Sequence, residues 1–243
     1  MTKKNIINYK TIDLSQYTIL IIDTSLNKIV VSVTRNYSLL SYKVIEYNRN
    51  YDEVLIDSLK EVLLNSNVNF YELDYVAVAI GPGNFTGIRV GMASARAIGM
   101  SLDCPVVGFT SLAALASEVF IDPGDVKIYS IIQAKRSRVY GQLFDINRSP
   151  LTKPIICGVE ELDQVITENA LPITNSEETS IAKNITYKEA GVDGIMLAAY
   201  DSLHHYIIKN TRRNYKGSPS PLYISGSGAK PPSNWKNKPI LKV

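Results

Sequence analysis

The spacing of apolar and polar positions divides the first part of the chain into expected strands and one helix. Residues 17–25 form an apolar run of strand length, and two segments at hairpin spacing, 28–36 and 38–48, are rich in β-branched and aromatic residues. Between 50 and 65 the apolar residues instead recur at helical spacing. The continuous apolar run 74–83 then predicts a strand that is buried on both faces. This order predicts a mixed sheet with flanking helices, and therefore an α/β fold.

A second helix, expected from 85 to 102, has apolar side chains on nearly all of its faces. Small residues recur in it at every fourth position, at Gly87, Gly91, Ala95 and Gly99, and they line a spiral along which another backbone can come close. A glycine inside a helix costs roughly 1 kcal/mol relative to alanine, so tight packing should offset this cost. A helix that is apolar on several faces either lies in the centre of a core or is covered by a partner.

The second half of the chain gives weaker signals. Residues 126–146 have the pattern of two strands joined by a basic turn at 134–138, and both 158–166 and 194–209 show helical spacing. The polar stretch 175–184 indicates no element. The sequence therefore predicts a second α/β unit but does not indicate all of its helices and strands.

Composition narrows the class of protein. The 243 residues carry a net charge of +3, and Lys and Arg are scattered until the C-terminal tail, so the sequence permits contact with RNA without requiring it. Cys104 and Cys157 match no metal-binding spacing, which favours a reducing compartment. No apolar run approaches the roughly 20 residues that span a bilayer. We expect a soluble cytoplasmic protein without membrane contact.

A glycine loop between the strand 74–83 and the second helix raises the question of phosphate binding. Gly81, Gly83 and Gly87 are spaced differently from a dinucleotide fingerprint, and no lysine completes a phosphate-binding P-loop. One interpretation is a weak anion or nucleotide contact formed by Gly81, Gly83 and the strand-end carboxylate of Asp23. The other, which we favour, is a pair of tight turns without a ligand.

No set of catalytic side chains follows from the sequence. His204 and His205 are adjacent within a helical segment and cannot both face one metal ion. The common metallopeptidase, serine-hydrolase and Cys–His patterns do not occur in the chain. We therefore expect no catalytic residue, no bound metal and no cofactor.

Three segments, ILIIDTSLNKIVVSV (19–33), IGPGNFTGIRVGMASARAIGM (80–100) and YSIIQAKRSRVYGQLF (129–144), resemble the TsaB (YeaZ) family, the bacterial partner proteins in threonylcarbamoyladenosine formation on tRNA. PLYIS (221–225) is similar to the C-terminal Pro-x-Tyr motif of that family. The resemblance implies an actin-like ATPase (ASKHA, ribonuclease H-like) α/β fold, in which two related lobes contain mixed sheets flanked by helices.

The same resemblance implies a noncatalytic subunit. TsaD-like relatives carry an H-x-x-x-H metal site on a helix for which this chain has Ser111 and Leu115 at the two ligand positions. The implied role is to dimerise with a TsaD-like catalytic subunit and activate it, so that a threonylcarbamoyl group is placed on N6 of the tRNA adenosine adjacent to the anticodon. A TsaE-like ATPase is a further expected partner, the protein alone is expected to form a homodimer, and tRNA is contacted at most indirectly.

The resemblance also locates the partner interface on the helices 50–65 and 85–102. The expected interface residues are Tyr51, Leu55, Ile56, Phe85, Ile88, Arg89, Met92 and Arg96. The implied domains are a polar leader (1–16), an N-terminal lobe with the partner-binding helices (17–109), a C-terminal lobe (110–225) and a basic flexible tail (226–243).

This sequence departs from the family pattern at three places. Gln133 stands where the family usually has an acidic residue, and the expected histidine near Tyr51 and arginine near Ser225 are missing. Two alternative functions stay open at this point. The first is an active actin-fold ATPase or phosphotransferase that uses Asp23 and the Gly81 loop, and the second, made less favourable by Ser111 and Leu115, is a metallopeptidase.

Overall fold

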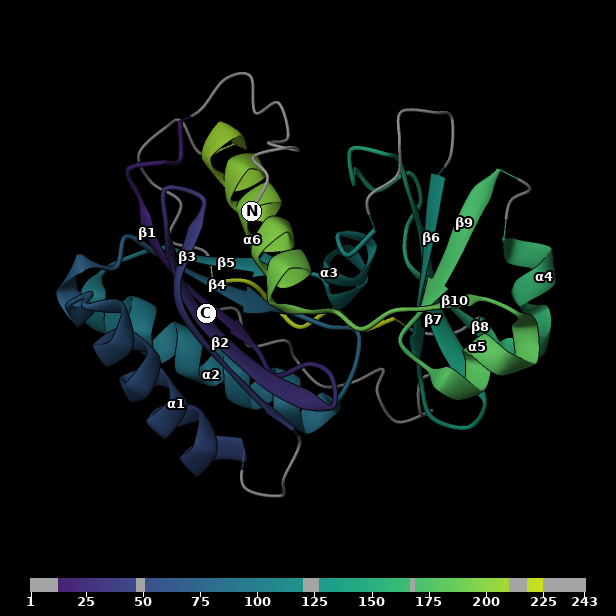
Figure 1. Cartoon of the computed structure of the whole chain (residues 1–243), viewed down its shortest axis with the longest axis horizontal. Coiled ribbons are helices and arrows are strands. Elements are labelled where there is room, and N and C mark those ends of the chain that lie inside the picture. Colours follow the sequence, from purple (N-terminus) through teal and green to yellow (C-terminus); the bar gives the residue numbers. More distant parts are fainter. Residues whose placement is uncertain (1–12, 47–50, 120–126, 167–168, 210–217, 225–243) are drawn as a thin grey trace, which may run out of the picture.

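The computed structural model describes residues 13–46, 51–119, 127–166, 169–209 and 218–224, which form two lobes that each contain a five-stranded mixed sheet (Figure 1). The strand order is β3-β2-β1-β4-β5 in the first sheet and β10-β9-β6-β7-β8 in the second. The strands of the first sheet are β1 (Thr18–Asp23), β2 (Lys28–Arg35), β3 (Ser38–Glu46), β4 (Tyr75–Ala79) and β5 (Val106–Phe109). Those of the second are β6 (Lys127–Gln133), β7 (Arg138–Phe144), β8 (Ile155–Gly158), β9 (Ala170–Thr174) and β10 (Thr186–Tyr187).

The first sheet follows the predicted order of elements. Strands β1, β2 and β3 are joined by antiparallel pairs, and β1, β4 and β5 are parallel. All six residues of β1 are buried, because this strand lies in the centre of the sheet with helices on both faces. The continuous apolar pattern of β1 and β4 is therefore explained by their central positions.

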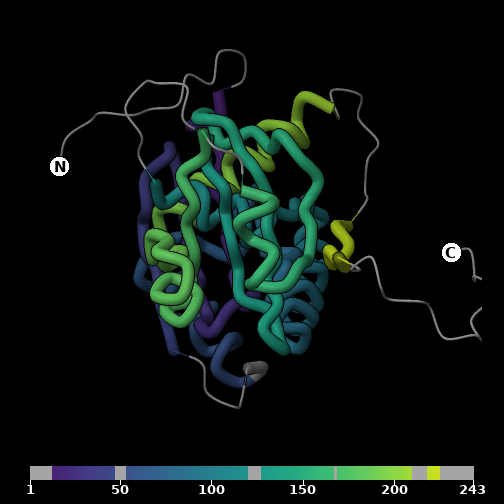
Figure 2. Tube along the Cα trace, turned by 90° about the vertical axis from the view of Figure 1, so that its right-hand side faces the viewer, coloured from purple at the N-terminus to yellow at the C-terminus, as the bar shows by residue number. Residues whose placement is uncertain are grey.

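Helices cover both faces of the first sheet (Figures 1 and 2). On one face α1 (Tyr51–Ser66) and α2 (Phe85–Leu102) enclose an apolar core with the strands. On the other face α6 (Val192–Lys209) packs on β5 and β1, and α3 (Ser111–Ala116) packs between α6 and the second sheet, so the core there continues into the second lobe. The first lobe therefore has three layers, and its core is continuous with that of the second lobe.

The spiral of small residues on α2 faces the sheet of its own lobe. The hydroxyl of Thr24 donates a hydrogen bond of 2.6 Å to the carbonyl oxygen of Gly87. A side chain at Gly91 would overlap this hydroxyl, and one at Gly99 would overlap Val106. The close backbone approach expected from the glycines is therefore made within the chain, between α2 and the strands β1 and β5.

The second lobe contains elements that the sequence pattern did not indicate. Helix α5 (Glu177–Lys183) lies within the polar stretch that indicated none, and the short strands β8 to β10 were not predicted. The predicted helix 158–166 is a 3₁₀ turn (Val159–Glu161) followed by α4 (Leu162–Val165). In the first lobe, another 3₁₀ turn (Phe70–Glu72) precedes β4.

The chain returns to the first lobe after the second sheet. Helix α6 packs on β5 and β1, although it follows all the strands of the second lobe in sequence. Residues 218–224, which we call the strap, then lie beside α2, where the amide of Leu222 donates to the carbonyl oxygen of Ile80 at 2.9 Å (Figure 2). The leader 1–12 and the tail 225–243 lie outside the described residues.

Candidate functional site

The outward side of α1 and α2 exposes large apolar side chains. Met100 is 83% exposed and Leu64 77%, and Ile56 and Phe85 are each about half exposed. Because the two helices pack on each other and on the same face of the sheet, these side chains lie on one side of the lobe. We call this set, Ile56, Leu64, Phe85 and Met100, the apolar face.

Negatively and positively charged side chains are separated on the same side of the lobe. Helix α1 exposes Glu53, Asp57 and Glu61, of which Asp57 is paired with Lys60 on the same helix at 3.4 Å. Glu61 is also paired with Lys43 of β3. Helix α2 has no acidic residue and carries Arg89 and Arg96. The side of the lobe is therefore acidic along α1 and basic along α2.

Three of the expected interface residues are in the core. Leu55, Ile88 and Met92 are buried against the first sheet, and Met92 is only 2% exposed. The helical spacing of these three residues was predicted correctly, but their side chains face the sheet and do not provide a surface for a partner. Ile56 and Phe85 are exposed, whereas the side chain of Tyr51 lies outside the described residues.

Arg89 and Arg96 are held by the strap. Arg96 Nη2 donates to the carbonyl oxygen of Pro219 at 2.6 Å. The guanidinium of Arg89 lies 3.6 Å from the centre of the Phe85 ring, and its Nη2 is 3.5 Å from the hydroxyl of Tyr223. The Pro-x-Tyr segment was visible in the sequence, but nothing in the sequence indicated that it contacts these two arginines.

The glycine loop packs on the turn that follows β1. A side chain at Gly83 would overlap the carbonyl oxygen of Ser25, and Gly81 has a φ of 95°, in the left-handed region that favours glycine. The amide of Asn84 donates to Ser25 O at 2.6 Å, and the side chain of Asn84 accepts from the amides of Thr86 and Gly87. Several amides that could bind an anion at the start of α2 are therefore already bonded within the chain.

Asp23 is buried beside this loop and bonds to the chain itself. Its Oδ1 accepts from the amide of Ser25 at 2.8 Å and from the Ser25 hydroxyl at 2.6 Å. Burial raises the pKa of Asp23, and the two bonds from Ser25 act in the opposite direction. The hydroxyl of Ser25 also lies 2.7 Å from that of Ser111, so the three side chains form one hydrogen-bonded group.

Ser111, Leu115 and Gln133, at which this sequence was compared with the family pattern, have structural roles. Leu115 is completely buried in the core, and Ser111 bonds to Ser25. The side-chain nitrogen Nε2 of Gln133 donates to the carbonyl oxygens of Ala134 and Arg138, which a carboxylate at this position could not do. Within the described parts of the chain, no three His, Cys, Asp or Glu side chains lie together as metal ligands.

Comparison with known proteins identifies relatives over most of the chain. The family model described as TsaD, tRNA N6-adenosine threonylcarbamoyltransferase, matches residues 43–206. The tRNA threonylcarbamoyladenosine biosynthesis protein TsaB of Buchnera aphidicola subsp. Acyrthosiphon pisum is 29% identical over 55% of this chain and 60% of its own length. TsaB of Bacillus subtilis is 28% identical over 74% of this chain and 79% of its own length. The chain thus spans about three fifths of the length of the Buchnera relative.

Solved structures agree on the fold. YeaZ from Pseudomonas aeruginosa is 18% identical, with a TM-score of 0.68 over 86% of this chain and all of its own. The dehydratase component A of Acidaminococcus fermentans is 10% identical, with a TM-score of 0.50 over 79% of this chain and all of its own. The predicted actin-like α/β fold with two lobes is confirmed. In the described residues, no helix has the length and apolar character that crossing a bilayer requires.

Proposed function

Because this chain belongs to the TsaD family, as a member of its TsaB (YeaZ) group, we propose that it acts in the formation of threonylcarbamoyladenosine on tRNA. Its role is that of a noncatalytic subunit, which dimerises with a TsaD-like catalytic subunit and activates it. A partner of this kind changes the activity of an enzyme only if it binds the active state more tightly than the inactive one.

The noncatalytic role is supported by the residues at the two positions where TsaD-like relatives carry their metal ligands. Ser111 uses its hydroxyl in the group with Ser25 and Asp23, and Leu115 is part of the core. The glycine loop supports the same conclusion, because the amides of Asn84, Thr86 and Gly87 are already bonded. These contacts give the loop and the helix start a structural purpose without a nucleotide.

The apolar face is the observation that carries the proposal. Isolated apolar side chains are common on protein surfaces, but here four large ones are exposed on two neighbouring helices that cover the same face of the sheet. The acidic side of α1 and the basic side of α2 give the surface a direction, which favours one docking orientation. We assign this face to the TsaD-like subunit.

We propose that the same face forms a homodimer in the absence of that subunit. A two-fold axis can bring the acidic α1 of one copy against the basic α2 of the other, because each copy carries both signs. We further propose that a TsaE-like ATPase joins the complex of the two subunits, that this chain contacts tRNA at most indirectly, and that the complex works in the cytoplasm.

Met100 is the most exposed residue of the apolar face. In the Met100→Glu variant we expect the affinity for the TsaD-like protein of the same cell to fall at least tenfold, because a carboxylate would lose its hydration in an apolar contact. Isothermal titration of the two purified proteins measures this change. The analogous substitution of Met92 is unsuitable, because this buried side chain supports the fold.

Ile181 provides a matched control on the second lobe. It is 84% exposed, so Ile181→Glu introduces the same charge at the same exposure, away from the apolar face. We expect this variant to bind normally and both variants to keep the thermal stability of the parent protein. Equal affinities of the Met100 and Ile181 variants would refute the interface on α2.

A further inference from the structure

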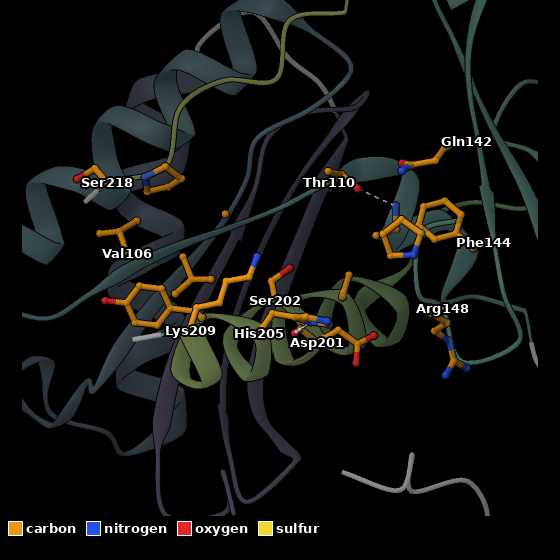
Figure 3. A pocket seen from close by; sticks show the side chains of 17 residues that line it. Val106, Thr110, Gln142, Phe144, Arg148, Asp201, Ser202, His205, Lys209 and Ser218 are labelled. Carbon is orange, nitrogen blue, oxygen red and sulfur yellow. Dashed lines mark hydrogen bonds between the residues drawn. The ribbon is translucent and has the colours of Figure 1, made fainter. Parts of the chain in front are cut away.

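A cavity of about 560 Å³ lies between the two lobes (Figure 3). Its walls come from β5 and α3, from β7 and the segment after it, from α6, and from the beginning of the strap. This volume is within the range of sites that bind small organic molecules in proteins. The walls include Val106, Val107 and Ala198, so most of a bound molecule would contact apolar groups.

Cationic side chains reach the cavity from two different elements. Lys209 is on α6, and Arg148 follows β7 in the second lobe. Along α6, Asp201, His205 and Lys209 recur every four residues, so they lie on one face of the helix, and all three line the cavity. Lys209, at the exposed end of the helix, presents a positive charge to an anion in the cavity.

His205 adds a group whose tautomer, when the ring is neutral, is set by its neighbour. Its Nδ1 lies 2.7 Å from the carbonyl oxygen of Asp201. Because a carbonyl oxygen only accepts, Nδ1 is the donor, and in the neutral ring Nε2 is an acceptor. The helix therefore offers the cavity an acceptor next to the cation of Lys209.

Gln142 supplies the second, independent observation. Its Nε2 donates to the carbonyl oxygen of Thr152 at 2.9 Å, which assigns Oε1 to the other side of the amide. The residue is 6% exposed, and Oε1 has no hydrogen-bond partner among the described residues. In Figure 3 the amide end points toward Thr110 on the wall of the cavity. A buried acceptor of this kind is stabilised by an N–H or O–H donor from a ligand.

We propose that this cavity binds a small organic anion, a carboxylate or a phosphate ester, whose apolar body carries an N–H or O–H group. The anionic group pairs with Lys209, and the donor bonds to Oε1 of Gln142. Because the walls belong to both lobes and to the strap, a bound molecule holds their relative positions. Binding also raises the melting temperature by mass action.

The experiment uses the full chain without its partner, so its result is independent of the proposed function. Three probes are titrated by calorimetry. AMP is a phosphate ester with an N–H donor, indole-3-acetate is a carboxylate with an N–H donor, and 1-naphthaleneacetate is a carboxylate of similar shape without one. We expect AMP or indole-3-acetate to bind with a Kd of about 1 mM or tighter. The preference between these two identifies the anionic group.

Two variants test the contacts. Lys209→Gln is expected to weaken binding of the preferred probe about tenfold, since it removes a charge-assisted hydrogen bond. Lys60→Gln, an equal change of charge on α1, is expected to have no effect. Gln142→Leu should weaken indole-3-acetate and spare 1-naphthaleneacetate.

The proposal is overturned if neither AMP nor indole-3-acetate binds at 5 mM, about five times the expected Kd. It is also overturned if Lys209→Gln and Lys60→Gln bind the preferred probe equally. Lys209 is exposed at the end of α6, so its substitution keeps the protein folded, and the test does not depend on the stability of the Gln142 variant.

Discussion

Among individual residues, Asp23 is a buried polar side chain with a structural role. It is 2% exposed, and both donors from Ser25 are needed to compensate a carboxyl group at this depth. Ser111 extends the group to the start of α3. The three side chains therefore join the turn after β1 to the helix that begins beside the glycine loop.

The raised pKa of Asp23 gives a prediction about pH. The ordinary aspartate value is 3.8, and burial raises the pKa in the folded protein above it. The folded state therefore holds the proton more tightly than the unfolded chain, and stability is lost as the pH rises from about 4 through the raised pKa. Asp23→Asn keeps an acceptor for Ser25 without a charge. We expect it to raise the melting temperature at pH 7 by about 2–4 °C, roughly the effect of 1 kcal/mol in a chain of this size.

Calorimetric melting between pH 4 and pH 8 checks this expectation. The difference between Asp23→Asn and the parent should shrink as the pH falls toward 4. Asp57→Asn, at an exposed position on α1, serves as the control and should show no such trend. A melting temperature of Asp23→Asn below that of the parent at pH 7 would mean that the ionised carboxylate stabilises the fold.

At the scale of elements, the packing of α2 on the first sheet depends on the hydroxyl of Thr24 and on the absence of a side chain at Gly91. Thr24 donates to the carbonyl oxygen of Gly87, and Gly91 leaves the space that the hydroxyl occupies. This contact brings α2 close to β1 and determines which face of the helix is turned outward. The exposed positions of Phe85 and Met100 follow from it.

Gly91→Ala tests this contact directly. Helix propensity alone would favour alanine by about 1 kcal/mol. Because the new methyl group would overlap the Thr24 hydroxyl, we expect a net destabilisation of about 1–3 kcal/mol in urea unfolding. The opposite change on the exposed side, Ala93→Gly, should cost about 1 kcal/mol from propensity alone. Stabilisation by Gly91→Ala would show that α2 has room to move away from β1.

In the whole molecule, the end of the chain connects the two lobes. Helix α6 and the strap return to the first sheet, and an ion pair of 3.0 Å between Lys28 and Glu189 joins β2 to the segment after β10. The carbonyl oxygen of Pro219 accepts from Arg96, so the strap is held by α2. Arg96 therefore has an internal contact in addition to any role at a partner surface, whereas Arg89 stays exposed beside the strap.

Arg96→Met should release the strap while keeping the apolar stem of the side chain. We expect the amide of Leu222, bonded to Ile80, to exchange its hydrogen about tenfold faster, because a hydrogen bond from a charged donor is lost. Hydrogen exchange followed by mass spectrometry measures this. Arg35→Met, which removes a bond from Arg35 to Thr18 elsewhere in the lobe, is the control. Equal exchange at Leu222 in both variants would contradict this role of Arg96.

The first sheet could be predicted because its strands and helices are long and strongly periodic. β1 to β4, α1 and α2 all lie close to their expected positions. Helix α5 and strands β8 to β10 could not be predicted, because each is too short for its periodicity to distinguish it from a polar loop. The sequence pattern near the end of the chain indicated only turns. In the structure, residues 218–224 of this segment form the strap.

The sequence by itself determined the family, the α/β class and the pairs of elements that form the first lobe, because local periodicity and short motifs carry this information. Only the tertiary structure decided that Met92 faces the core and Met100 faces outward, that the glycines of α2 pack on the sheet, and that Gln142, Arg148 and Lys209 line one cavity. A periodic pattern gives the faces of a helix but does not say what covers each of them. Residues far apart in the chain meet only when the core that lies between them has formed.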